Sequence, residues 1–204
     1  MVWEDLVAAY AWADAAEWET YTFSVVTGKT EEEVIRAFGG DPAGSRAMTF
    51  AEAADEQADH IHADRALLRV VTVEKHVVAI EWGFHGSIPE IARRASSDGG
   101  EFFSIHHNVL AQHQVMHARD GRVDGMFDPS VVGDAAWMES APDIPAWAAG
   151  IPFHLETLDS ESFALLEHIM GVPVVHAWMD APLRTVSLAS PDALFGDADA
   201  AWLP

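Results

Sequence analysis

The centre of the chain alternates short apolar runs with charged or glycine-containing turns. LLRVVTV and HVVAIEW are separated by Glu-Lys, and EFFSIHH and QHQVMHA are separated by Asn-Val-Leu-Ala. Arg-Asp-Gly-Arg then leads into VDGMF. Because β-branched and aromatic residues favour strands and short turns join neighbouring strands, residues 67–127 are predicted to form five strands, with a short helix between the second and third.

Several other segments carry apolar residues at helical spacing. Residues 2–18 are predicted to form one helix, since Trp3, Leu6 and Val7 fall on one face. Three further helices are predicted to begin at capping boxes, in which a hydroxyl residue and a glutamate three positions later satisfy each other's backbone N–H groups. These boxes are Thr30–Glu33, Thr49–Glu52 and Ser87–Glu90. Asp159 is predicted to cap a helix that ends at Gly171.

These elements predict an α+β fold: a curved antiparallel sheet of about five to six strands flanked by three to four helices. TYTFSVVTG at residues 20–28 supplies a further strand, and VPVVHAW and LRTVSLAS are short strand candidates near the end. After residue 129 the chain is rich in Ala, Pro and Trp with little periodicity. We therefore expect a single domain over 1–204, with 1–129 as its core and 130–204 as an extension that wraps or extends the sheet.

Composition removes several function classes. The 204 residues include no cysteine, which excludes disulfides, thiolate nucleophiles and thiolate zinc sites. No run of about 18 uncharged apolar residues could span a membrane. The start, MVWEDLVAAY, lacks the positive region of a secretory signal, so a cytoplasmic location is predicted.

The chain is strongly acidic, with 33 acidic and 11 basic residues and a formal net charge of −22. Such a surface repels phosphates, so neither nucleic acid nor an anionic membrane is an expected partner. It would attract a basic protein. The alternative is that the acidity serves solubility or reflects the composition of the whole proteome.

The hairpin over residues 102–118 holds four of the eleven histidines. With its turn centred on Val109-Leu110, His106 would lie opposite His113, with Cβ atoms about 5 Å apart on one face. This pair is the predicted metal site. His117 would lie about 13 Å further along the strand, and His107 would point to the other face.

A catalytic zinc needs about three protein ligands. The third would come from elsewhere, and the candidates are His76, His85 and Glu81. The alternative interpretation is a solvated or packed pair of histidines with no metal. No sequence motif indicates any other cofactor.

Two sets of residues are candidates for binding a partner. The segment EAADEQADHIHAD places carboxylates on the face of a predicted helix, which would receive a basic partner or would simply be solvated. Tryptophans after residue 129 would form an aromatic surface, or they would pack in the core. The predicted partner-binding residues are Glu52, Asp55, Glu56, Asp59, Trp137 and Trp147.

Motifs for nucleophilic or phosphate chemistry are lacking. There is no Gly-x-Ser-x-Gly elbow, and FGGDPAG lacks the lysine of a phosphate-binding loop. Acid–base pairs such as Glu81 with Asp128 are common in any acidic domain.

The order of the segments YTFSVVTG, TEEEVIRAFGGDP, VVTVEKHVVAIEWGFHGSIPEIARRAS, EFFSIHHNVLAQHQVMHARDGRVDGMFDP and FALLEHIMGV resembles an uncharacterised bacterial family of domains of unknown function. That family is associated with high-GC Gram-positive bacteria. The resemblance covers roughly residues 15–175. It implies an α+β fold around an antiparallel sheet, and it implies no established activity or site.

Three functions follow as hypotheses. The first is a non-enzymatic binding protein, similar in role to an immunity protein or antitoxin, that neutralises a basic partner. The second is a metal-dependent enzyme or metal-binding domain that uses the histidine hairpin. The third is a small-ligand sensor or a homo-oligomeric scaffold.

Overall fold

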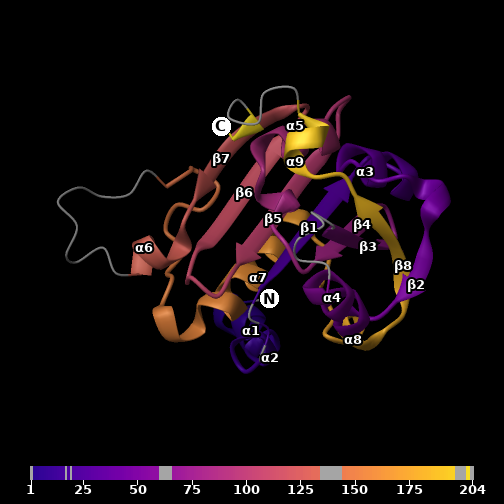
Figure 1. Ribbon diagram of the computed structural model, residues 1–204. Coiled ribbons are helices and arrows are strands. Elements are labelled where there is room, and N and C mark those ends of the chain that lie inside the picture. Colours follow the sequence, from indigo (N-terminus) through magenta and orange to yellow (C-terminus); the bar gives the residue numbers. More distant parts are fainter. Residues whose placement is uncertain are drawn as a thin grey trace.

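Eight strands form one antiparallel sheet in the order β2-β8-β3-β4-β1-β5-β6-β7 (Figure 1). The computed structural model describes residues 2–16, 18, 20–59, 66–133, 144–195 and 201–202. The strands are β1 (Tyr21–Thr27), β2 (Arg46–Met48), β3 (Ala66–Val73), β4 (His76–Glu81), β5 (Glu101–His107), β6 (His113–Arg119), β7 (Arg122–Phe127) and β8 (Leu183–Leu188).

Helices cover both faces of the sheet. The α-helices are α1 (Trp3–Ala9), α2 (Ala11–Asp14), α3 (Glu31–Ala37), α4 (Phe50–Asp59), α5 (Pro89–Ala95), α6 (Pro129–Gly133), α7 (Leu158–Met170), α8 (Ala177–Asp180) and α9 (Pro191–Leu194). Three 3-10 turns are η1 (Pro42–Gly44), η2 (His85–Ser87) and η4 (Leu155–Thr157). Helices α1, α2 and α7 pack on one face, and α3 and α5 pack on the other.

Alternation along the strands produces these two cores. In β1, Phe23 and Val25 join the cluster under α7, whereas Val26 joins the cluster under α3 and α5. Successive strand side chains point to opposite faces, so a strand covered on both sides reads as a continuous apolar run. This explains why YTFSVVT carries buried residues at nearly every position.

The α+β class and the antiparallel sheet are confirmed, but the predicted numbers of elements were too low. The described residues hold eight strands and nine α-helices. Strand β2 has three residues and α8 has four, and such lengths are too short to show a period. Residues 2–18 form two helices that meet at Tyr10, and VPVVHAW does not form a strand.

The capping boxes were predicted with mixed success. The Glu33 N–H donates to Thr30 Oγ1 at 3.3 Å, and the Thr30 N–H donates back to Glu33 Oε2 at 2.8 Å. Thr49 and Glu52 form the same reciprocal pair, at 3.2 and 2.8 Å. Both boxes begin helices where the sequence indicated.

The caps at Ser87 and Asp159 were predicted wrongly. Ser87 Oγ donates to the Phe84 carbonyl within η2, and α5 begins at Pro89 without a side-chain cap. Proline at the first helical position has no N–H group that needs a partner, so the absence of a side-chain cap costs the helix little stability. Helix α7 starts at Leu158, so Asp159 lies inside the helix and not at its cap. The Asp159 carboxylate accepts a hydrogen bond from the Tyr21 hydroxyl.

The last third of the chain supplies central parts of the fold. Helix α7 buries Phe163, Leu165 and Leu166 against the sheet, and β8 lies between β2 and β3. No helix in the described ranges is long and apolar enough to cross a membrane.

Candidate functional site

The register of the β5–β6 hairpin decides which histidines meet. His107 pairs with His113, and His106 pairs with Gln114. The predicted pairing of His106 with His113 was therefore wrong by one position. The turn is one residue longer than predicted, because Asn108 Oδ1 accepts from the backbone N–H groups of Leu110 and Gln112 and so includes Gln112 in the loop.

A shift of one residue moves a side chain to the other face of a sheet. His107 and His113 lie on the face covered by α7, with ring centroids 4.3 Å apart. His106 lies on the opposite face, in a row that runs from Glu81 through Thr22 and His106 to Gln114. The hairpin thus presents a histidine pair on one side and a single buried histidine on the other.

Helix α7 brings a carboxylate to the histidine pair. His107 Nδ1 lies 3.2 Å from Asp159 Oδ1, and His113 Nδ1 lies 3.9 Å from the same oxygen. One ligand atom from each of these three residues lies within 4.8 Å of the others. The Tyr21 hydroxyl donates to Asp159 Oδ1 at 2.7 Å and holds the carboxylate in place. We call His107, His113 and Asp159 the histidine–aspartate cluster.

The protonation states of the cluster suit a cation. Burial would raise the pKa of Asp159, but the hydrogen bonds from His107 and Tyr21 and the charges of the two histidines hold it below its usual value. Burial, helped by the neighbouring His107, lowers the pKa of His113 despite Asp159 and Asp128. Burial and Asp159 raise the pKa of Tyr21 well above normal, so its hydroxyl stays a donor. The cluster therefore presents an ionised carboxylate beside a neutral His113.

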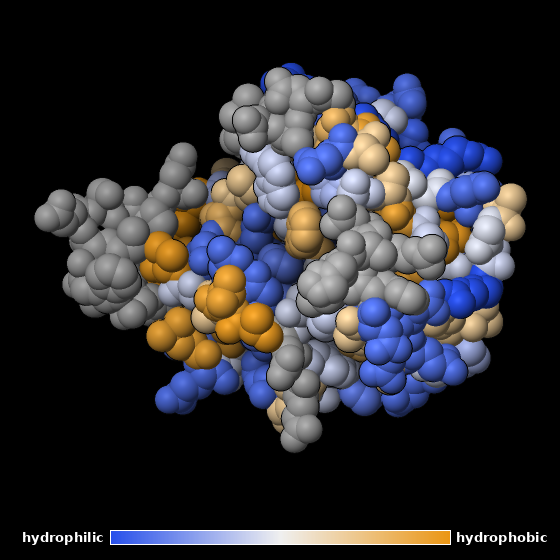
Figure 2. Space-filling view, viewed as in Figure 1, coloured by the Kyte–Doolittle hydropathy of each residue, from blue (hydrophilic) through white to orange (hydrophobic). Residues whose placement is uncertain are grey.

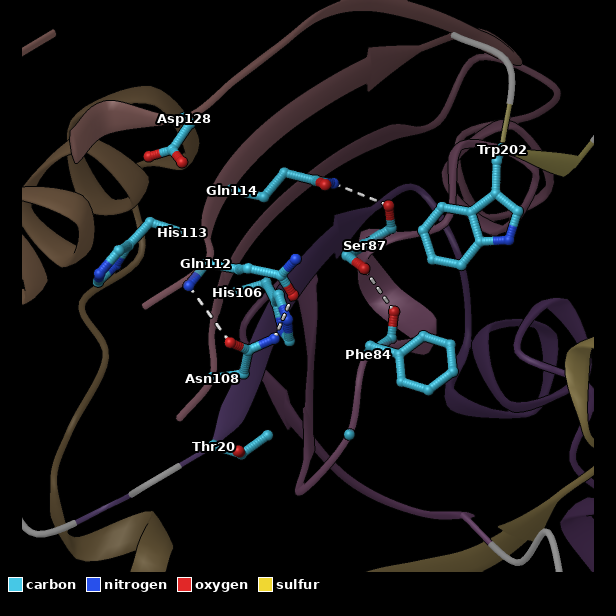
Figure 3. A pocket seen from close by; sticks show the side chains of 11 residues that line it. Thr20, Phe84, Ser87, His106, Asn108, Gln112, His113, Gln114, Asp128 and Trp202 are labelled. Atoms are coloured by element: carbon cyan, nitrogen blue, oxygen red, sulfur yellow. Dashed lines mark hydrogen bonds between the residues drawn. The ribbon is translucent and has the colours of Figure 1, made fainter. Parts of the chain in front are cut away.

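A cavity of about 460 Å³ adjoins the cluster and includes His113 in its wall (Figure 3). Near the centre of the face in Figure 2 lies a hydrophilic region with hydrophobic side chains beside it. The turn residues Val109 and Leu110 next to the cavity are 64% and 75% exposed. The lining residues are Thr20, Gly83, Phe84, Ser87, His106, Asn108, Gln112, His113, Gln114, Asp128 and Trp202.

The tautomer of His106 follows from its neighbours. Thr22 Oγ1 lies 2.5 Å from the Gly83 carbonyl, which can only accept, so the single Thr22 proton goes there. His106 Nδ1, 2.8 Å from Thr22 Oγ1, must then carry the proton of that contact. Burial lowers the pKa of His106 in spite of the nearby Glu81 charge. His106 is thus a neutral imidazole that donates from Nδ1 to Thr22 Oγ1.

Amide groups and aromatic rings form much of the remaining wall. Gln114 Nε2 donates to the Ser87 carbonyl at 2.7 Å, and Asn108 Nδ2 donates to Gln112 Oε1 at 2.6 Å. The rings of Phe84 and Trp202 stack with centroids 6.0 Å apart. Figure 3 shows these groups around one space, with Asp128 and His113 on one side and Trp202 on the other. No lysine or arginine is among the described lining residues.

The residues proposed as third ligands lie away from the cluster. Glu81 and His85 form their own buried pair, with Oε2 and Nδ1 3.4 Å apart, and the Gly86 N–H donates to Glu81 Oε1 at 2.6 Å. His76 is buried opposite Thr27 on β1. His117 Nε2 contacts Glu101 at 2.9 Å, at a different level of the sheet.

The four acidic residues predicted to bind a partner all lie on α4, but their contacts differ. Glu52 completes the Thr49 capping box, and Glu56 forms an ion pair with Arg46. Asp55 and Asp59 are exposed on α4.

Of the two tryptophans proposed for a partner surface, the structure describes only Trp147. Trp147 packs against Phe103 and Phe127, as the core alternative requires. Trp137 lies outside the described residues.

Sequence reasoning missed Asp159 and Tyr21 as members of the site. Both were assigned to other roles, Asp159 as a helix cap and Tyr21 as an ordinary strand residue. A carboxylate in the first turn of an apolar helix was the available signal, because such a group needs a polar partner when it is buried.

The buried His85 gives stability a pH dependence. Burial alone would lower its pKa, but the Glu81 carboxylate and the Ala189 carbonyl outweigh burial and raise it. A raised pKa contributes stability below the unfolded value of about 6.5, and this stability is lost as the pH rises through the folded value. We therefore expect His85→Gln to cost more unfolding free energy at pH 6 than at pH 8 in urea titrations.

Glu81→Gln supplies the control for this measurement. It removes the charge that raises the pKa and leaves the burial that lowers it, so in that background His85→Gln should no longer cost more at pH 6 than at pH 8. A larger cost at pH 8 than at pH 6 in the parent chain would contradict the assignment.

Together these features define an α+β domain with two histidines and a carboxylate gathered at one end of its antiparallel sheet. The chain belongs to the DUF6461 family, a family of unknown function, whose model matches residues 5–189. The resemblance to a family of unknown function is thus confirmed, whereas bacterial origin stays a prediction. No curated protein and no solved structure matches the chain.

Proposed function

We propose that this protein binds a divalent transition-metal ion through His107, His113 and Asp159 and holds a small polar ligand in the adjoining cavity. The observation that carries the proposal is the meeting of two imidazoles and a carboxylate, whose ligand atoms lie within 4.8 Å of one another. His107 and His113 come from the neighbouring strands β5 and β6, whereas Asp159 comes from α7, which is distant in sequence.

The spacing of the ligand atoms is close to that of a metal site. Tetrahedral zinc with bonds of about 2.0–2.1 Å places its ligand atoms about 3.4 Å apart. The observed separations from Asp159 Oδ1 are 3.2 Å to His107 and 3.9 Å to His113, so small side-chain rotations suffice. Two histidines and one carboxylate suit Zn²⁺, Fe²⁺ and Co²⁺ and leave positions open for a ligand.

The cavity favours a polar ligand that is not an anion. Its wall combines amides, the His106 ring, the Asp128 carboxyl and the stacked rings of Phe84 and Trp202, without a cationic side chain among the described lining residues. A molecule with hydrogen-bonding groups for the amides and one apolar face would match these features.

Calorimetric titration of Zn²⁺ into chelator-treated protein, purified without a histidine tag, tests the proposal. We expect saturation at one ion per chain, with affinity that falls at acid pH as the imidazoles become protonated. Absence of saturable binding would contradict the proposed function.

Tyr21→Phe is expected to weaken Zn²⁺ binding by about tenfold or more while the cluster itself stays intact. The hydroxyl orients Asp159, and partners of this kind typically contribute about 10- to 100-fold in metal affinity. The same calorimetric titration measures the effect.

Tyr10→Phe is the matched control. Tyr10 is buried in the same core cluster, but its hydroxyl contacts Glu167 and the Val174 N–H instead. Equal losses of Zn²⁺ affinity in both variants would show that Tyr21 acts through general stability.

A further inference from the structure

A second hollow lies between α4 and α8, on the other side of Thr20 from the cavity. Its volume is also about 460 Å³, and Thr20 lines both spaces. Helices α4 and α8 pack side by side, as Figure 1 shows. We call this hollow the α4–α8 groove. Its lining residues are Trp18, Thr20, Thr49, Phe50, Ala51, Ala54, Asp55, Trp82, Met179 and Asp180.

The groove combines aromatic rings with carboxylates. Trp18 and Trp82 are half-buried, so each keeps part of its surface accessible, and the ring centroids of Trp18 and Phe50 are 6.2 Å apart. The Trp82 carbonyl accepts from Gln57 Nε2 at 2.7 Å, which fixes the backbone there. Asp55 and Asp180 are exposed, and within the described residues neither forms an ion pair.

A cation lies near the groove but is occupied elsewhere. Arg69 is fully buried beneath Phe50, with Cζ 5.7 Å from the ring centroid. Its guanidinium donates to the carbonyls of Trp178 and Ala181 at the end of α8, and it does not line the groove. The two exposed carboxylates therefore face solvent without a lining cation among the described residues.

We propose that the α4–α8 groove docks a basic peptide segment of a partner protein and takes one arginine or lysine side chain between its tryptophans and its carboxylates. Cations are attracted both to indole faces and to carboxylates. The formal net charge of −22 draws such a partner toward the surface. This proposal is independent of the metal site.

The surface beside the groove favours an extended segment over an isolated small cation. Glu52, Asp55 and Asp59 are all exposed on α4 at spacings of three and four residues, so they form one line of negative charge. A chain anchored at Asp55 could place further basic side chains along this line. Of the four acidic residues first predicted from α4, Asp55 becomes the anchor.

Fluorescence anisotropy with a labelled Gly-Arg-Gly-Arg-Gly-Arg peptide tests the proposal. We expect saturable binding to the full chain that weakens with added sodium chloride. A peptide with citrulline in place of arginine keeps the shape and loses the charge, so it should bind about tenfold more weakly or worse. Equal binding of the two peptides, or no saturable binding of either, would overturn the proposal.

Charge-removing variants locate the site. Asp55→Asn should weaken arginine-peptide binding about threefold to fivefold, and Asp55→Asn with Asp180→Asn about tenfold or more. Trp82→Leu, which keeps every charge, should weaken it severalfold.

Asp98→Asn is the matched control, since its carboxylate is 89% exposed and precedes β5 at the end remote from the groove. It should change affinity less than about twofold, because surface charge at this distance is largely screened. A loss equal to that of Asp55→Asn would show that only net charge matters and would overturn the site.

Discussion

Zn²⁺ affinity is expected to fall at least about 100-fold when His113 is replaced by alanine, and to change less than about twofold when His106 is replaced. His113 lies 3.9 Å from Asp159 Oδ1 and belongs to the histidine–aspartate cluster. His106 lies on the opposite face of the sheet, hydrogen-bonded to Thr22. Calorimetric titration of the parent and both variants provides the comparison.

His107→Ala completes the series and should match His113→Ala. All three substitutions remove one imidazole from the same hairpin, so His106→Ala controls for the general effect of losing a ring. A loss of affinity with His106→Ala and not with His107→Ala would restore the register predicted from the sequence and contradict the cluster.

Arg69→Met is expected to destabilise the fold by about 3 kcal/mol or more. The guanidinium is fully buried and donates to carbonyls of Met48, Trp178 and Ala181, which join β2 and α8 to β3. Burial lowers its pKa to about 10, so it is still charged at neutral pH. Methionine fills much of the space but leaves the carbonyls without donors, at a cost of about 1–3 kcal/mol each.

Urea denaturation compares this variant with Arg36→Met, which removes an exposed guanidinium from α3. The control should lie within about 0.5 kcal/mol of the parent. Equal stabilities of the Arg69 and Arg36 variants would mean that the carbonyls find other donors, and that Arg69 does not hold α8 in place.

The local pattern predicted most of the regular elements. Strands β3 to β7 lie where the apolar runs indicated, and the boxes at Thr30 and Thr49 begin helices as expected. These features depend on neighbours within a few residues, which a sequence displays directly. The cap predicted at Ser87 was wrong because two local interactions compete with it. Pro89 starts the helix without a side-chain cap, and the Ser87 hydroxyl donates to the Phe84 carbonyl instead.

The site was harder to predict because it depends on one residue of register and on one distant helix. The side chain of Asn108 lengthens the hairpin turn, which exchanges His106 for His107 in the pair. Asp159 reaches the pair only because α7 packs across β1 and β5. Neither a periodicity nor a motif in the sequence encodes that packing.

The central claim is that His107, His113 and Asp159 bind one metal ion, and long-range proton–nitrogen NMR of the imidazoles tests it most directly. During a Zn²⁺ titration of the tag-free chain, the ring nitrogens of His107 and His113 should shift and reach their end points at one equivalent. The ring nitrogens of His106 should move little because His106 lies on the other face of the sheet. Those of His117 should move little because His117 lies further along β6, beside Glu101. Unchanged signals from His107 and His113 at one equivalent would contradict the claim.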